Sequence, residues 1–352
     1  MAELADAMDS KSIGRKVVWV QLPPPAFQSM ILVIAGPTAV GKSALAMKIA
    51  KEFNGEIISA DSRQVYRGLD IGTGKITKRE MQSVPHHLLN VANPRKQFSA
   101  AEYARLAQEK IADISARGKF PIIVGGTGHY IDVALGRVTI PDVSPNPELR
   151  KRLEKNSAEE LFALLQQLAP ARAATIDRHN PRRLVRAIEI AQWQNSLSGS
   201  AERKLASAAG ASTRNFLAKK YPCSARHFPN KSFASACTCW IGLKLSPQAL
   251  RQKIAKRLAA RMRRGLVAEV KRLHTQGVSW KRMDELGLEY RFVSRFLREL
   301  MTKNEMIAKL QTEIYHYAKR QMTWFKKNTN IHWFQPSQEK EIFGMLKSAL
   351  GD

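Results

Sequence analysis

The clearest chemical signal in the sequence is a glycine-rich loop at residues 36–43, which reads GPTAVGKS. The loop fits the pattern G-x-x-x-x-G-K-[ST] and lies between an apolar run and a segment typical of a helix. In such a loop the backbone amides and the helix N-terminus hold a polyphosphate, a lysine adds positive charge, and a hydroxyl can ligate Mg²⁺. We therefore predict a phosphate-binding loop with Lys42 as its cation and Ser43 as its magnesium ligand. The strand-loop-helix setting disfavours the alternative, a turn without a ligand.

A carboxylate is expected beside this loop. Kinases and nucleoside triphosphatases with such a loop need an acidic residue at the end of a second strand, where it organises metal and water. Here the predicted strand at residues 121–124 is followed by GGTG, without an acid, whereas Asp61 comes directly after the predicted strand around residues 56–59. Asp61 can act as a Mg²⁺ ligand or as a general base, and the residue pattern leaves both roles open.

Three short β-branched runs, at residues 31–35, 56–59 and 121–124, predict the strands that position these residues. Residues 43–53 and 100–117 predict helices at the spacing of βαβ units. Because the carboxyl ends of parallel strands line the ligand crevice, the residues after each strand should converge. The predicted fold class is α/β, with a P-loop NTPase-like parallel sheet flanked by helices.

The rest of the chain predicts a core interrupted by one helical domain. Residues 194–235 are rich in Ser, Ala and Lys with little periodicity, which predicts a long loop. The proposed division has four parts: a loose N-terminal extension at 1–29, with Met30 as an alternative start, a P-loop α/β core at 30–140, a helical insertion domain at 141–215, and a return to the core with C-terminal helices at 216–352.

The charge of the chain points to an anionic partner. Among 352 residues, 57 Lys and Arg stand against 30 Asp and Glu, which gives a formal net charge of +27. Basic residues recur along the predicted helices at 247–276 and 303–325, which favours nucleic acid as the partner. A solvated basic surface without a partner is the alternative.

Cysteine content and hydropathy predict a cytoplasmic, soluble protein. Three cysteines in a chain of 352 residues argue against a disulfide framework. No stretch of 18 or more apolar residues occurs, and the N-terminus lacks the pattern of a signal peptide. The potential metal ligands Cys223, His227, Cys237 and Cys239 are interpreted as free side chains in a loop, because their spacing does not fit a zinc site.

Several further blocks resemble those of the tRNA dimethylallyltransferases, also called tRNA isopentenyltransferases. Each block except the phosphate loop is weak by itself, but all occur in the family's order between about residues 31 and 334. They are GPTAVGKS at 36–43, DSRQVY at 61–66, DIGT at 70–73, PHHL at 85–88, GGTG at 125–128, NPRRLVRA at 180–187, GL at 265–266, YAKRQ at 317–321 and TWF at 323–325. The family's usual GYKE block reads GLEY at 287–290.

The resemblance implies transfer of a dimethylallyl group from dimethylallyl diphosphate to the exocyclic amine of the adenosine 3′-adjacent to the tRNA anticodon. The implied partners are dimethylallyl diphosphate and the anticodon stem-loop, with Mg²⁺ as cofactor. A monomer suffices, without an obligate protein partner, because one chain carries every block. An adenine stacked in an anticodon loop must be extruded before its amine can react.

The same resemblance assigns roles to single residues. Catalytic roles fall to Asp61, which takes the amine proton, and to Thr127 and Lys42. The implied diphosphate-binding residues are Gly36, Pro37, Thr38, Ala39, Val40, Gly41, Lys42, Ser43 and Arg257. The implied tRNA-binding residues are Asp61, Ser62, Arg63, Gln64, Thr127, Arg182, Arg183, Leu184, Val185 and Arg186.

Alternatives remain for some of these roles and for the function. The arginines at 182, 183 and 186 can form a solvated helix face. Trp324 and Phe325 are interpreted as core residues and not as base-stacking residues. The alternative functions are an adenylate prenyltransferase, which shares the loop and the aspartate, a P-loop kinase or ATPase, and a non-catalytic RNA-binding protein, which has no use for Lys42 and Asp61 together.

Overall fold

The computed structural model describes residues 30–81, 84–138, 140–141, 143–206 and 237–350. The expected extension at residues 1–29 and the possible ligands Cys223 and His227 lie outside the described residues. The chain divides into two compact units. The first comprises the described residues of Met1–Phe98, Leu106–Ile131 and Ala236–Asp352, and the second those of Ser99–Arg105 and Asp132–Ser235. The proposed insertion domain at 141–215 falls within the sequence range of the second unit.

The first unit is built on a six-stranded parallel sheet with the strand order β3-β2-β4-β1-β5-β6. All residues of the three central strands β1, β2 and β4 are buried, as the β-branched runs predict. The strands are β1 Met30–Ala35, β2 Gly55–Ala60, β3 His86–His87, β4 Phe120–Gly125, β5 Cys237–Leu243 and β6 His332–Phe334. The predicted α/β class and parallel sheet are thereby confirmed.

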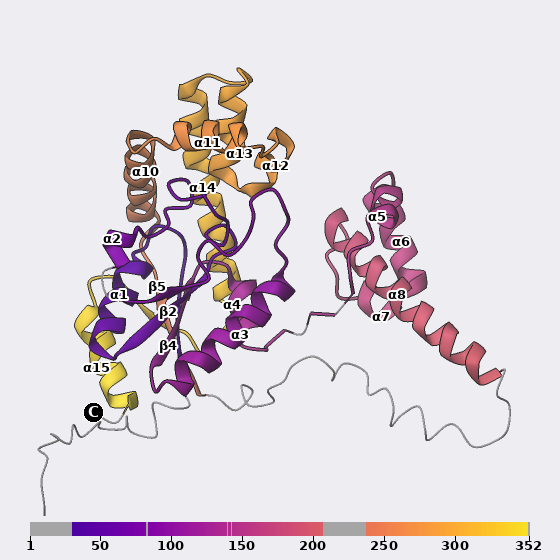
Figure 1. Cartoon of the computed structure of the whole chain (residues 1–352), viewed down its shortest axis with the longest axis horizontal. Helices are drawn as coiled ribbons and strands as arrows, with labels where there is room; N and C mark the ends of the chain where they lie inside the picture. The colour runs from indigo at the N-terminus through magenta and orange to yellow at the C-terminus, as the bar shows by residue number, and fades with distance from the viewer. Residues whose placement is uncertain (1–29, 82–83, 139, 142, 207–236, 351–352) are drawn as a thin grey trace, which may run out of the picture. The chain divides into compact units, whose positions relative to one another are not determined.

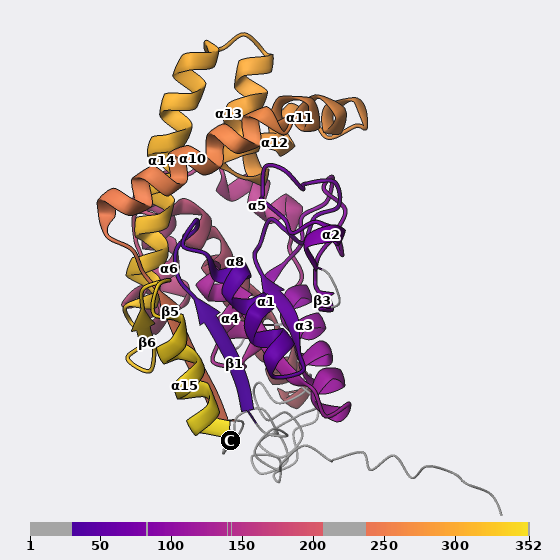
Figure 2. The ribbon, with the colours of Figure 1, turned by 90° about the vertical axis from the view of Figure 1, so that its left-hand side faces the viewer.

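The helices of this unit include two that lie side by side on the sheet. The rings of Phe53 and Phe343 stack with centroids 6.0 Å apart, and Lys48 Nζ lies 2.7 Å from Glu339 Oε2, which joins α1 to α15 (Figure 2). The helices are α1 Lys42–Glu52, α2 Lys78–Met81, α3 Ala100–Ala116, α4 Gly128–Ala134, α10 Pro247–Arg263, α11 Leu266–Thr275, α12 Trp280–Leu286, α13 Leu288–Leu297, α14 Lys303–Phe325 and α15 Glu339–Leu350, of which α3 and α4 also extend into the second unit.

Helices α10 to α14 gather beyond the carboxyl ends of the strands (Figure 1). The sequence predicted one helix over 247–276, but Gly265 adopts φ 94 and separates α10 from α11. A left-handed residue of this kind ends a helix at little cost only when it is glycine. Two helices, of 17 and 10 residues, therefore stand in place of the single predicted helix.

The second unit is a small helical bundle with its own core. Its helices are α5 Pro147–Leu153, α6 Ala158–Leu168, α7 Pro170–Ala173 and α8 Pro181–Ala206. Asn146 caps α5, and Ser157 forms a capping box on α6. The expected loop at 194–235 is wrong over its first part, because α8 continues to Ala206. The core residues are Leu149, Leu153, Leu161, Leu165, Ala173, Leu184, Val185, Ala187 and Ile188.

In the described part of the chain, no helix combines the length and the apolar character that a bilayer crossing requires.

Candidate active site

The phosphate-binding loop follows β1 in a conformation that its glycines permit. Gly36 and Gly41 have φ angles of 137 and 104, in the region that glycine tolerates best. A Cβ atom at Gly36 would stand 2.5 Å from the carbonyl oxygen of Leu243, so no larger residue fits there without a shift. Helix α1 begins at Lys42 without a side-chain cap. Its first amides can therefore donate to an anion.

Lys42 folds back over this loop. Its Nζ donates to the carbonyl oxygens of Gly36, at 2.9 Å, and Pro37, at 2.7 Å. Burial, and next nearby Arg257, lower the pKa of Lys42 to about 7, although Asp61 acts in the opposite direction. An amine whose pKa lies near neutral gains its full charge when an anion comes within contact. Lys42 is thus suited to a ligand that carries negative charge.

Arg257 reaches the same loop from α10. Its Nη1 donates to Thr38 Oγ1 at 3.1 Å, although the two residues are far apart in sequence. Burial and neighbouring Arg261 lower its pKa to about 10. The structure therefore places Arg257 beside the phosphate-binding loop, where the family resemblance led us to expect it.

Asp61 stands at the end of β2 in a tight turn. Its Oδ1 accepts hydrogen bonds from the backbone amides of Arg63, at 2.8 Å, and Gln64, at 3.3 Å. This turn fixes the direction of the carboxylate. Within the described residues both bonds fall on Oδ1, which leaves Oδ2 to accept a proton. The geometry suits a general base.

Thr127 joins Asp61 at the ends of β2 and β4. The Thr127 amide donates to Ala60 O at 3.2 Å, and the Ser62 amide donates to Thr127 Oγ1, also at 3.2 Å. Tyr317 on α14 hydrogen-bonds to the Thr127 side chain, and burial and nearby Asp61 raise the pKa of Tyr317 to about 12. The expected convergence of residues that follow the strands is therefore found at Thr38, Asp61 and Thr127.

Gln321 is a site residue to which the sequence analysis assigned no role. Its Oε1 accepts from the Thr38 amide at 2.8 Å, and its Nε2 donates to Gly126 O at 2.7 Å. This buried amide bridges the phosphate-binding loop and the turn that carries Thr127. Gln321 lies one helical turn after Tyr317, so the YAKRQ block places both side chains on the same face of α14. This spacing of four residues is the sequence signal that could have indicated Gln321 as a site residue.

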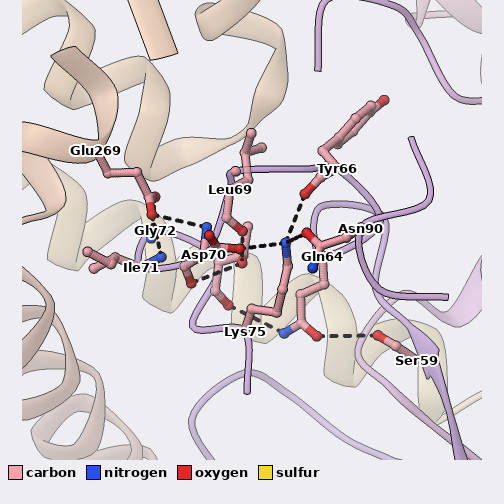
Figure 3. Close-up of polar contacts among 12 residues, drawn as sticks. Ser59, Gln64, Tyr66, Leu69, Asp70, Ile71, Gly72, Lys75, Asn90 and Glu269 are labelled. Carbon is pink, nitrogen blue, oxygen red and sulfur yellow. Dashed lines mark hydrogen bonds and ion pairs between the residues drawn. The ribbon is translucent and has the colours of Figure 1, made fainter. Parts of the chain in front are cut away.

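A second network holds the loop that follows Asp61 (Figure 3). Glu269 on α11 accepts from the backbone amides of Asp70, Ile71 and Gly72 at 3.1, 2.7 and 3.0 Å. Tyr290 donates its hydroxyl to the same carboxylate at 2.8 Å. One buried side chain thus satisfies three consecutive backbone donors, which would be costly if they were buried without partners.

Lys75 and Gln64 extend this network toward the site. Lys75 Nζ donates to Tyr66 O, Asp70 Oδ1 and Asn90 Oδ1 at 2.8, 2.8 and 2.6 Å, while burial lowers its pKa. Gln64 Nε2 donates to Thr73 O at 3.5 Å. The loop that Glu269 anchors to α11 therefore also holds Gln64, a residue expected to contact the acceptor base (Figure 3).

We expect Glu269→Gln to lower the free energy of unfolding by roughly 3 kcal/mol. Glutamine has one acceptor oxygen, so at least one of the buried amides loses its partner. Urea unfolding followed by circular dichroism measures the change. Glu285→Gln is the matched control, because Glu285 is exposed and its carboxylate pairs with Arg282 at 2.8 Å. Equal stability of the two variants would contradict this view of the network.

The implied tRNA-binding residues of the second unit differ in accessibility. Arg182 and Arg183 are exposed at the start of α8. The structure contradicts a side-chain contact by Leu184 and Val185, because these side chains are buried in the core of the unit, with 0% and 8% exposed. Apolar residues on the inner face of an amphipathic helix are buried this way.

Arg186 is half-buried and tied within its own unit. Its Nη1 lies 2.5 Å from Glu189 Oε2, and its Nη2 donates to Val143 O at 2.9 Å. Glu189 also pairs with Arg150 at 2.7 Å. Arg182 and Arg183 are therefore the arginines of this block whose charge faces solvent.

The two aromatic residues at the end of α14 behave differently. Phe325 is buried, as expected, but the core interpretation of Trp324 is wrong, because 39% of this residue is exposed. A Cβ atom at Gly128 would stand 2.1 Å from Trp324 Cδ1, so the indole lies directly on this glycine. The GGTG block needs its last glycine for this contact.

Ser43 lies exposed at the start of α1, as a magnesium ligand of this loop must. Within the described residues, no group of three His, Cys, Asp or Glu side chains forms a site for a metal ion. Mg²⁺ commonly takes most of its ligands from phosphate groups and from water.

Comparison with known proteins gives a consistent result. The family described as IPP transferase matches residues 64–328. The tRNA dimethylallyltransferase 2 of Trichlorobacter lovleyi is 38% identical over 313 residues, which cover 88% of this chain and 93% of that protein. The tRNA dimethylallyltransferase of a Roseiflexus species is 38% identical over 305 residues, with 86% and 91% covered.

Solved structures also resemble the chain. The full-length tRNA isopentenylpyrophosphate transferase of Bacillus halodurans is 31% identical, with a TM-score of 0.62 over 92% of this chain and 97% of that one. A eukaryotic dimethylallyltransferase acting on tRNA is 23% identical, with a TM-score of 0.66 over 89% and 77% of the two chains, and shows the same fold.

Proposed function

The chain belongs to the IPP transferase family, and we propose on this basis that it transfers a dimethylallyl group from dimethylallyl diphosphate to a base of tRNA. The acceptor in this proposal is the exocyclic amine of the adenosine 3′-adjacent to the anticodon, which becomes isopentenyladenosine. The observation that supports it most is the hydrogen-bonded contact between the Asp61 turn and Thr127 beside a phosphate-binding loop. Transfer from a diphosphate to an amine needs both a phosphate-binding loop and a base beside it.

The reaction follows from the roles of these residues. The amine nitrogen forms a bond to the first carbon of the dimethylallyl group while the bond from that carbon to the diphosphate oxygen breaks. The bonding electron pair leaves with the diphosphate, and the amine proton passes to Asp61. Lys42, Arg257 and the amides of the loop stabilise the charge that develops on the leaving group. Thr127, held by Ser62 and Tyr317, positions the extruded base.

Mg²⁺ fits this site through the donors that the diphosphate brings, with Ser43 as the protein ligand. The ion supplies further charge stabilisation to the leaving diphosphate. The second unit, with an insertion domain at 141–215, serves in this proposal as a tRNA-binding part of a cytoplasmic enzyme.

Acceptor choice tests the proposal. An anticodon stem-loop with adenosine 3′-adjacent to the anticodon should take up label from dimethylallyl diphosphate, while one with guanosine at this position should not. Guanosine carries no amine at the reacting position. Equal labelling of the two stem-loops would show that the acceptor has been assigned wrongly.

We expect tRNA affinity to fall steeply with added salt, because Lys and Arg side chains that neutralise phosphates release counterions. The double variant Arg182→Ala/Arg183→Ala should bind more weakly and lower the slope of log affinity against log salt by about 1 to 2. Titration of fluorescent tRNA at several salt concentrations measures the slope. Lys347→Ala on α15 is the control. An unchanged slope in the double variant would remove these arginines from the tRNA interface.

A further inference from the structure

Helix α10 carries two arginines whose guanidinium groups meet at one point. Arg257 and Arg261 lie one helical turn apart and therefore project from the same face. A Cβ atom at Gly74 would stand 2.2 Å from Arg257 Nη2 and 2.3 Å from Arg261 Nη2. The two nitrogens are thus close neighbours across this glycine, which has a φ of 62. Of the two, the family resemblance implies a role for Arg257 only.

Arg261 is buried and incompletely satisfied. Only 7% of the residue is exposed. Its Nη1 donates to Glu289 Oε1 at 2.6 Å. Its Nε is buried and has no hydrogen-bond partner among the described residues. A guanidinium with one ion pair and an unsatisfied donor is costly unless a ligand completes its contacts.

The surroundings of Arg261 concentrate positive charge toward the phosphate-binding loop. Arg257 bonds to Thr38 of the loop, and Lys42 lies in the loop itself. Burial and, next in size, the charge of Arg261 lower the pKa of Arg257. In the same way, burial and the charge of Arg257 lower the pKa of Lys42, so neighbouring cations in this group repel one another. Asp61 and Glu289 offset this repulsion in part. An anion with several charges, placed against these residues, would remove it.

We propose that Arg261 is a second arginine of the diphosphate site, which donates to the diphosphate group beside Arg257 while Glu289 holds its guanidinium in place. This inference rests on the proposed function, because it assumes that the loop holds a diphosphate. A purely internal ion pair between α10 and α13 is the competing account. The two accounts differ in what happens when only Glu289 is changed.

Binding of inorganic diphosphate in the presence of Mg²⁺, measured by calorimetry on the full chain without tRNA, separates them. Arg261→Met should weaken binding about tenfold or more, because a charged donor is lost. Arg261→Lys should fall between, since it keeps charge but not the fork. Glu289→Gln should bind within about threefold of wild type, because Arg261 retains its charge and the glutamine oxygen can still accept its hydrogen bond. The pair Arg261→Met/Glu289→Leu removes both charges, avoids a lone buried carboxylate, and should lose binding like the single variant.

Two results would overturn the inference. One is wild-type diphosphate binding by Arg261→Met or, if that variant does not fold, by the double variant. The other is an equal loss in Arg261→Met and Glu289→Gln, which marks the ion pair as structural. Glu285→Gln is the control for a carboxylate change on a neighbouring helix. Failure of the proposed function is recognised separately, because a wild-type protein that binds diphosphate without prenylating tRNA leaves the role of Arg261 intact.

Discussion

Asp61→Asn should slow transfer to tRNA by about 10²- to 10⁴-fold, the range expected when a general base is lost. Asparagine keeps an oxygen in the place of Oδ1, so the bonds from the amides of Arg63 and Gln64 can persist. What it lacks is the basic Oδ2. Single-turnover transfer from dimethylallyl diphosphate, with diphosphate binding measured alongside, gives the result.

The same variant should bind diphosphate almost as wild type does, because Asp61 takes the proton of the amine, whereas Lys42, Arg257 and the loop amides hold the leaving group. Asp113→Asn on α3 is the control, since Asp113 is exposed and pairs with Arg117 and Lys110. A transfer rate close to wild type in Asp61→Asn would remove Asp61 as the base. Loss of diphosphate binding with loss of transfer would instead favour its role as a metal ligand.

Lys42→Met should weaken diphosphate binding about 10- to 100-fold at pH 6, because a charged donor to the diphosphate is lost. Burial and Arg257 lower the pKa of Lys42 to about 7, so in the free protein the amine is charged below this pH and neutral above it. The advantage of the wild type over Lys42→Met should therefore shrink as the pH rises through 7. Titrating both proteins with one ligand cancels the ionisation of the ligand itself.

A difference between wild type and Lys42→Met that does not change between pH 6 and 9 would contradict the lowered pKa. Lys48→Met serves as the control on the same helix, because Lys48 is exposed and pairs with Glu339. An unaltered affinity in Lys42→Met would remove the loop as the diphosphate site and, with it, the basis of the proposed reaction.

The sequence predicted the strands β1, β2 and β4, because buried β-branched runs are local patterns. It missed the inner strand β5, which holds Cys237 and Cys239, two residues that we expected in a loop. Buried parallel strands read as apolar runs, and their carboxyl ends converge by the geometry of the sheet. Helix α14 was predicted with its observed bounds, Lys303–Phe325. The edge strands β3 and β6 were missed, since segments of two and three residues carry no periodic signal.

The contacts of the site that the sequence did not predict join segments that are far apart along the chain. Gln321 reaches Thr38, Glu269 reaches the amides of residues 70–72, and Arg261 meets Arg257 at Gly74. No local pattern indicates which residue a buried polar side chain will meet across the sheet. The sequence also did not show that Leu184 and Val185 are buried while the neighbouring Arg182 and Arg183 are exposed. An amphipathic helix turns one face to the core and the other to water.

The most direct test is transfer of label from dimethylallyl diphosphate to unmodified tRNA, to AMP and to no acceptor, with ATP hydrolysis followed in parallel. Our account predicts label on tRNA alone, without turnover of ATP. Label on AMP in place of tRNA would assign the chain to adenylate prenylation, and ATP hydrolysis without any transfer would contradict the central claim that the loop serves a prenyl diphosphate.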